Sequence, residues 1–397
     1  MKYNFDMITD RRNTNSLKYD FAKERDKPED VLPLWVADMD FPAATPIIEK
    51  LEAAVHHGIF GYSEAKGPYF DAVQSWMSRH FQWDVQKDWL VKTPGVVFAL
   101  AAAIRAFTIP GEDVMIQQPV YYPFSEVIRD NDRTLVNSSL RLIDGQYEMN
   151  FEDIEEKFRH GDVRLFLLCS PHNPVGCVWT EEELRKIGDL CLKYHVLVVS
   201  DEIHSDFVYP SFQHHVFAGL SPEYADITIT CTSPSKSFNL AGLQTSNIFI
   251  ANADLRRKFR KAVAAAGYSQ LNQLGLVACQ AAYESGEDWL NAVKDYLCEN
   301  LSYLRSFLNS RIPEVKLVEP EGTYLIWLDF RKLGLTRDQL EDLIVSKAHL
   351  WLDSGSMFGP DGEGFQRINI ACPRATLQQA LTQLELGIQA YRETQNV

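Results

Sequence analysis

Three short apolar segments in the middle of the chain constrain the fold most. Residues 164–169, 196–200 and 227–231 are rich in aliphatic and β-branched side chains, and each has the length of a buried strand rather than a helix. Helix-like or loop segments separate them, and Thr180-Glu-Glu-Glu183 is a capping box that begins a helix reaching to about residue 194. This alternation predicts an α/β fold with a mainly parallel sheet covered by helices on both faces.

A polar side chain follows each predicted strand. Asn173 comes after the first, Asp201 directly after the second, and Lys236 in a Ser-rich turn after the third. Because open α/β sheets bind ligands at the carboxyl ends of their strands, we expect these three groups to converge. The set fits pyridoxal phosphate (PLP). A carboxylate can keep the pyridine nitrogen protonated, an amide can donate to the ring phenolate oxygen, and the lysine can hold the aldehyde carbon as a Schiff base, so that the ring stabilises a carbanion at the substrate α-carbon.

Further segments extend the predicted fold towards both ends of the chain. The alanine-rich residues 95–107 are typical of a buried helix, and residues 113–117 of a short strand. Towards the C-terminus the pattern changes to one long helix over 288–309, a strand over 323–329 and a closing helix from Thr376. These last elements predict a second, smaller domain.

Several stretches of the sequence resemble the fold-type I PLP enzymes of the aminotransferase superfamily. More narrowly, the chain is similar to the cysteine-S-conjugate β-lyases, the cystathionine β-lyase (MalY/PatB) group. The N-terminal stretch 32–42 and the stretch around Lys236 point to the lyases, and the others are shared across the superfamily. The stretches that carry the resemblance are 32–42, 170–176, 200–206, 233–244 and 365–374.

The resemblance implies a domain organisation. The N-terminal segment 1–50 would pack with a small α/β domain formed by residues 287–397. Residues 51–286 would form the large PLP-binding domain, with a mainly parallel sheet of the seven-stranded type. The active site would lie between the two domains, and a homodimer would place Tyr62 at the cofactor phosphate of the neighbouring subunit.

The phosphate of PLP needs hydrogen-bond donors. Thr93-Pro-Gly95 precedes the alanine-rich helix, so the free amides near Gly95, Val96 and Val97 form an anion site at a helix N-terminus. The hydroxyls of Ser233 and Ser235 add donors beside the lysine. Where the superfamily commonly has a phosphate-binding arginine, eight residues after the lysine, this chain has Gln244, which weakens charge compensation.

Other site residues follow from the resemblance. Tyr121 would stack on the pyridine ring, and His204 stands where related aminotransferases carry a tyrosine that contacts the ring oxygen. Arg367 would hold the substrate α-carboxylate with a bidentate fork, helped by the amide of Ala37 and by Asn173. Arg374 is a rival carboxylate ligand, but its position before a helix is interpreted as surface.

Composition excludes several classes of function. The net charge of −15 argues against a nucleic-acid or anionic-membrane surface, and the short basic run Arg256–Lys258 is interpreted as a solvated helix face. Seven cysteines without a Cys-x-x-Cys pair suit a reducing cytoplasm. No signal-like or membrane-spanning stretch is visible. We expect no metal site, because zinc-ligand spacing is absent and the pair His214-His215 is interpreted as a loop.

The residues alone predict a PLP enzyme that removes the α-proton of an amino-acid substrate. The step to β-elimination, in which a cystathionine-like substrate yields a thiol, pyruvate and ammonia, rests on the resemblance. An aminotransferase would use the same lysine and stays an alternative. A third hypothesis is an interaction protein, since the resembled group includes a member that restrains a transcription activator.

Overall fold

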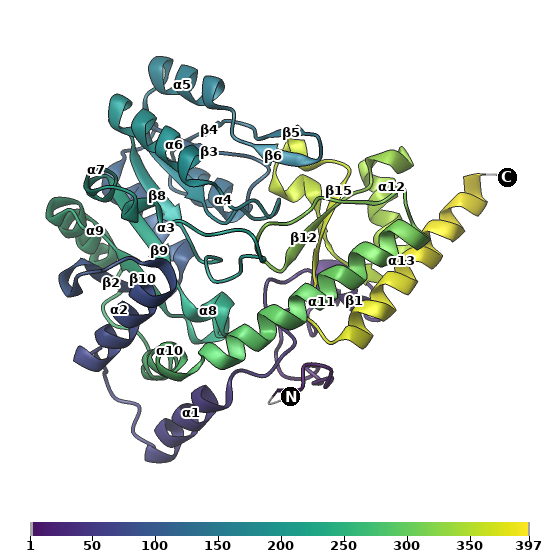
Figure 1. The fold of residues 1–397 in the computed structure, drawn as a ribbon, viewed down its shortest axis with the longest axis horizontal. Helices are drawn as coiled ribbons and strands as arrows, with labels where there is room; N and C mark the ends of the chain where they lie inside the picture. The colour runs from purple at the N-terminus through teal and green to yellow at the C-terminus, as the bar shows by residue number, and fades with distance from the viewer. Residues whose placement is uncertain (1–2, 396–397) are drawn as a thin grey trace.

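The computed structural model describes residues 3–395 and contains the predicted α/β sheet (Figure 1). Its seven strands follow the order β2-β10-β9-β8-β7-β3-β4. From β9 to β4 all neighbouring strands are parallel, whereas β10 is antiparallel to both of its neighbours. The strands are β2 (Leu90–Thr93), β10 (Ser246–Phe249), β9 (Thr228–Thr232), β8 (Leu197–Asp201), β7 (Val163–Cys169), β3 (Asp113–Ile116) and β4 (Thr134–Asn137).

Helices cover both faces of this sheet, so both faces are buried. Alternate side chains of each strand point to opposite faces, and each strand therefore contributes to both cores. Leu165, Leu167 and Val199 pack with α3 (Val96–Phe107), α4 (Pro123–Arg129) and α9 (Ala253–Ala265) on one face. Phe166 and Val198 pack on the other face, against α5 (Phe151–His160), α6 (Glu181–Tyr194) and α7 (Pro222–Asp226). Continuous apolar strands are what a sheet covered on both sides requires.

The capping box in the sequence correctly predicts where α6 begins. The Thr180 hydroxyl accepts a hydrogen bond from the Glu183 amide, the Glu183 carboxylate accepts one from the Thr180 amide, and α6 begins at Glu181 as the capping box predicts. The interpretation of Arg256 as part of a solvated face is wrong. Its guanidinium is buried against the sheet, where it donates to the carbonyls of Ile250 and Ala251 and pairs with Asp88 at 2.8 Å.

A second group of elements is built from the two ends of the chain. β1 (Leu32–Pro33) pairs in parallel with β13 (Leu350–Trp351), and the amide of Asn369 donates to the carbonyl of Leu34. The long helix α11 (Glu287–Arg311) packs along α13 (Arg374–Gln395) beside a four-stranded sheet (Figure 1). That sheet contains β11 (Lys316–Leu317), β12 (Leu325–Asp329), β15 (Phe365–Asn369) and β14 (Asp353–Ser354).

The remaining elements cover the edges of these two groups. α10 (Gln273–Ser285) packs against α1 (Thr45–His57) and α2 (Gly67–Phe81), and α8 (Pro234–Ser237) is a single turn after β9. The hairpin β5 (Arg141–Ile143)–β6 (Gln146–Glu148), α12 (Arg337–Asp342) and the π-helical segment Leu343–Lys347 that follows it are further elements, besides several short 3-10 helices. No helix in the described part of the chain is long and apolar enough to cross a membrane.

Candidate active site

A cavity of about 230 Å³ lies at the carboxyl ends of β7, β8 and β9. These three strands are parallel and adjacent, so the residues that follow them meet at one edge of the sheet. All of the predicted site residues line this cavity except Tyr62 and Arg367. The predicted residues that line it are Ala37, Gly95, Val96, Val97, Tyr121, Asn173, Asp201, His204, Ser233, Ser235 and Lys236.

Lys236 enters the cavity from the single turn α8. The Ser233 hydroxyl caps this turn by accepting the Ser235 amide at 3.1 Å, which fixes the direction of the lysine. The lysine Nζ donates to the carbonyl of Ala37 at 2.7 Å. Desolvation lowers the pKa of Lys236 to about 8, and the charge of Arg367 acts in the same direction, while Asp38 and Asp201 oppose them. A useful fraction of the amine is therefore neutral near physiological pH.

Asp201 is buried at the end of β8. Its Oδ1 accepts the amide of Ile203 at 3.1 Å. Burial raises the pKa of this carboxyl to about 7, although the Ile203 amide and the charge of Lys236 lower it. A carboxyl in this position gains most from a cationic N–H partner, because such a partner offsets the cost of burying its charge.

Arg367 lies behind Asn173 rather than on the cavity wall. Its Nη1 donates to the Asn173 Oδ1 at 2.9 Å, and its Nη2 donates to the Trp35 carbonyl at 2.9 Å and pairs with Asp353. The guanidinium is thus oriented on two sides, and its buried Nε has no hydrogen-bond partner. Orientation by fixed acceptors suits a side chain that must present a donor fork to a carboxylate.

Arg374 is not the surface residue that its sequence context suggested. It is half-buried at the start of α13, and its Nε donates to Asn300 of α11 at 2.7 Å. Its guanidinium also lies 5.1 Å from the centre of the Tyr303 ring. Arg374 therefore joins two helices and does not line the cavity.

The start of α3 provides an anion site in the cavity. Gly95 occupies the N-cap position, and no side chain caps the free amides that follow it. Val96 and Val97 line the cavity at this point. Gln244, the residue that stands in the place of the expected arginine, also lines it. Helix amides and the dipole of the helix thus supply much of the attraction for a phosphate.

His204 and Tyr121 complete the walls. His204 is buried, its Nδ1 has no partner, and burial together with the charges of Lys236 and Arg367 lowers its pKa well below the ordinary value. The ring is therefore neutral, with a free nitrogen beside the cavity. Tyr121 is fixed by its amide, which donates to the Asn173 carbonyl at 2.9 Å, and burial raises the pKa of its phenol.

Tyr62 does not reach this cavity. Its side chain is fully exposed, in the irregular segment between α1 and α2. It lines a neighbouring hollow with Phe60 and Tyr268, and that hollow shares Pro94 and Gln244 with the cavity. The exposed position of Tyr62 is compatible with a contact to another subunit. This contact stays a prediction.

Sequence reasoning missed several residues of the site. The Tyr324 hydroxyl donates to the same Ala37 carbonyl at 3.0 Å, so this carbonyl receives two donors. Asp38, the next residue, forms an ion pair with Arg11 at 2.6 Å, and its charge acts on Lys236. Neither contact has a local signal, because the partners lie far apart in the chain.

The donor set fits PLP. A buried carboxyl faces the cavity from one strand end, an amine of lowered pKa from the next, and helix amides with hydroxyls lie at the far side. The unpartnered His204 Nδ1 is free for a further polar contact. The described residues contain no group of three or more side chains able to hold a metal ion.

Comparisons with known proteins decide the family. The model of aminotransferase class I and II matches residues 29–384. The chain belongs to this family. Cystathionine β-lyase PatB of Bacillus subtilis is 43% identical over 97% of this chain and 100% of its own length. Protein MalY of Escherichia coli is 33% identical over 98% of this chain and 100% of its own.

Solved structures of family members agree with this placement. Cystalysin of Treponema denticola, a structure that contains a pyridoxal 5′-phosphate cofactor, superposes with a TM-score of 0.95 at 38% identity. The match covers 98% of this chain and 100% of cystalysin. The aminotransferase-like α/β fold predicted from the sequence is therefore confirmed.

Proposed function

We propose that this enzyme is a PLP-dependent carbon–sulfur β-lyase that cleaves cystathionine and other S-substituted L-cysteines. The observation that carries the proposal is the convergence of Lys236, Asp201 and Asn173 on one cavity at the start of α3. The full-length similarity to a cystathionine β-lyase supports the choice of reaction within the family.

The cofactor would be held by groups that the protein fold itself orients. Asp201 would accept from the ring N–H, Asn173 and His204 would contact the ring oxygen, and Tyr121 would cover one ring face. The amides at the start of α3 and the Ser235 hydroxyl would bind the phosphate. When bound, PLP supplies an electron sink that stabilises negative charge at the substrate α-carbon.

Lys236 would move the proton. Because the pKa of Lys236 is about 8, a fraction of its amine is neutral near physiological pH. This neutral Nζ accepts the α-proton of the substrate. The electron pair left at the α-carbon forms the Cα–Cβ double bond and expels the sulfur on Cβ as a thiolate. The released 2-aminoacrylate reacts with water to give pyruvate and ammonia, so atoms and charges balance.

Arg367 would bind the α-carboxylate of the substrate. Its unpartnered Nε and the neighbouring Asn173 amide form the donor side, while Asp353 and the Trp35 carbonyl hold the guanidinium from behind. The Ala37 carbonyl accepts from Lys236 and Tyr324. A substrate carboxylate is also an acceptor, so its contact at this residue would be with the Ala37 amide.

The active form would be a homodimer in the cytoplasm. Tyr62 is too exposed for an aromatic side chain without a partner, and Ile59 and Phe60 beside it are 66% and 62% exposed. A second subunit would cover this segment and receive Tyr62 at its own cofactor. The seven free cysteines agree with a reducing compartment. The small domain would comprise residues 287–397 with segment 1–50, and the large domain residues 51–286.

The first test is pyruvate release from the purified holoenzyme with cystathionine and no added keto acid. We expect pyruvate and free thiol in repeated turnovers, with the cofactor absorbance returning to its starting form. The second candidate is an aminotransferase, the activity that the description of the family names. That reaction would convert the cofactor to its amine form and stop until a keto acid is supplied, and this result would replace the lyase proposal.

A further inference from the structure

A second polar cavity lies on the other side of the turn that carries Lys236. It measures about 180 Å³ and lies between α2, α11 and the loop after β8. Asp206, His80, His214 and Lys294 line it, and none of these residues lines the cofactor cavity.

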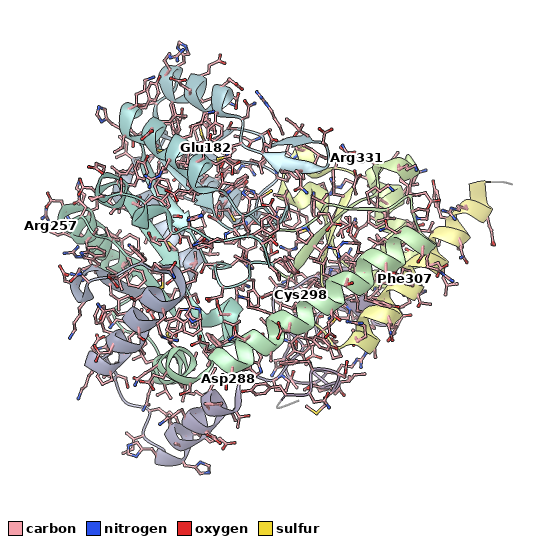
Figure 2. All side chains as sticks on the ribbon, in the orientation of Figure 1. Glu182, Arg257, Asp288, Cys298, Phe307 and Arg331 are labelled. Carbon is pink, nitrogen blue, oxygen red and sulfur yellow. The ribbon has the colours of Figure 1, made fainter. Side chains whose placement is uncertain are left out.

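An apolar cavity of about 240 Å³ adjoins it and shares Val208, Phe212 and Lys294 with it. Figure 2 shows Cys298, which lines this apolar cavity, near the middle of α11. The two cavities together form one pocket, called the α11 pocket below, with a polar half and an apolar half. The other lining side chains of this half are mainly apolar, Phe207, Tyr209, Pro210 and Leu297, with Asp295 and Thr323 beside them.

The polar half contains two opposite charges that the protein leaves unpaired. Asp206 is buried, and its carboxylate accepts only neutral donors, the Trp76 Nε1 at 3.2 Å and the Ser237 hydroxyl. Lys294 is half-buried and forms no ion pair with any described residue. Because a buried charge is costly without an opposite charge, Asp206 favours a ligand that brings an ammonium. Lys294, which lines the same pocket, can pair with a carboxylate of that ligand.

Two buried side chains that face the pocket have free polar atoms, and Asp295 adds a second carboxylate to the half that Lys294 also lines. His214 is buried, its Nε2 bonds to Glu202 at 2.9 Å, and its Nδ1 has no partner. The Tyr209 hydroxyl in the apolar half is also buried without a partner. Burial lowers the pKa of His80, which favours the uncharged imidazole. Lys294 is therefore the main cation of the pocket. Because the His214 Nε2 donates to a carboxylate, the free Nδ1 of the neutral ring is an acceptor and can bind the ammonium of a ligand, while the Tyr209 hydroxyl can donate to its carboxylate.

We propose that the α11 pocket binds a free amino acid with an apolar side chain, with the zwitterion between Asp206 and Lys294 and the side chain among Phe207, Tyr209 and Leu297. The ligand would lie next to the catalytic turn without entering the cofactor cavity, because Ser237, which bonds to Asp206, is adjacent to Lys236 in the chain. The site is separate from substrate turnover and stands whether the reaction is elimination or transamination.

The test is a calorimetric titration of the holoenzyme with L-leucine, with the cofactor absorbance followed in the same titration. Binding at the active site changes that absorbance, so binding in the α11 pocket is the event that releases or absorbs heat without changing it. We expect one such silent event per chain. Lys294→Gln should weaken it about tenfold or more, because the carboxylate loses its ionic partner.

Two further variants make the result specific. Cys298→Trp should abolish the silent event by filling the apolar half, and Lys258→Gln, which removes an exposed lysine from α9, should leave it unchanged. Each variant is checked for the cofactor absorbance of the wild type, which reports a folded active site. Absence of a silent event in the wild type, or equal binding in Lys294→Gln, overturns the proposal.

Discussion

At the scale of single residues, the site depends on matched shifts of two titrating groups. Burial raises the pKa of Asp201 to about 7 and lowers that of Lys236 to about 8, so the protein surroundings alone bring each group close to losing its charge near neutral pH. A bound pyridinium would restore the charge of the carboxylate, and the amine would remain ready to accept a proton. The same desolvation thus prepares a cofactor partner and a base.

Lys236→Ala is expected to remove turnover while the fold persists, because the lysine Nζ bonds only to the Ala37 carbonyl in the described structure. The absorbance of lysine-bound cofactor should disappear, and pyruvate release should fall to background. Circular dichroism before and after cofactor addition checks the fold. Activity at the wild-type rate would remove Lys236 from the mechanism.

Asp201→Asn should stabilise the apoprotein at pH 8 while weakening cofactor binding. A carboxyl whose folded-state pKa is raised from 3.8 to about 7 binds its proton more tightly in the folded state, so its contribution to stability is lost as pH rises through that window. The variant lacks this loss, and its free energy of unfolding should exceed that of the wild type by up to about 4 kcal/mol at pH 8. Urea unfolding of both apoproteins at pH 4, 6 and 8 measures the difference, and parallel pH profiles would contradict it.

At the scale of elements, the site is the meeting of strand ends with helix starts. β7, β8 and β9 deliver their following residues to one edge, and α3 begins there with uncapped amides. One α-helix and one strand therefore separate Asn173 from Asp201 in the chain, and another α-helix and strand separate Asp201 from Lys236. Helix caps away from this edge affect stability without touching the chemistry.

Thr180→Ala tests that separation. Loss of the hydroxyl that accepts from the Glu183 amide should lower the free energy of unfolding by about 1 kcal/mol. Because α6 packs on the sheet face opposite α3 and Thr180 does not line the cavity, kcat and KM should stay at wild-type values. Thr180→Ser keeps the hydroxyl and should restore the stability. A matched loss in both variants would show that the cap is not the cause.

At the scale of the whole molecule, distant parts of the chain complete one site. Trp35 and Ala37 come from the N-terminal segment and Arg367 from β15, whereas Lys236 and Asn173 follow strands of the large sheet. The site therefore exists only when the sheet and the chain ends are packed together. In the homodimer proposed above, the exposed segment around Tyr62 would extend this dependence to a second subunit.

A mixing experiment tests the role of the second subunit. Lys236→Ala and Tyr62→Ala dimers should each have little activity alone. After mixing in equal amounts and exchange of subunits, about a quarter of the wild-type activity should return, since half of the dimers are mixed and each holds one intact site. If Tyr62 serves its own subunit or has no role, mixing will add nothing beyond the average of the two variants.

Local sequence signals determined a large part of this protein. Apolar runs predicted the strands, and a capping box predicted the start of α6. The residues that would bind the cofactor were recognised because each follows a predicted strand. These features depend on neighbours in the chain, so they can be recognised without the fold. Family resemblance then indicated the reaction and the positions of Arg367 and Tyr62.

Only the tertiary structure decided contacts between residues far apart in the chain. It placed β10 antiparallel to its neighbours, buried Arg256 beneath the sheet, and joined Arg374 to α11. It also brought the Ala37 carbonyl to Lys236 and opened the α11 pocket around Asp206. The physical reason is that burial, pairing and pKa depend on which side chains meet in space, and local periodicity carries no information on such meetings.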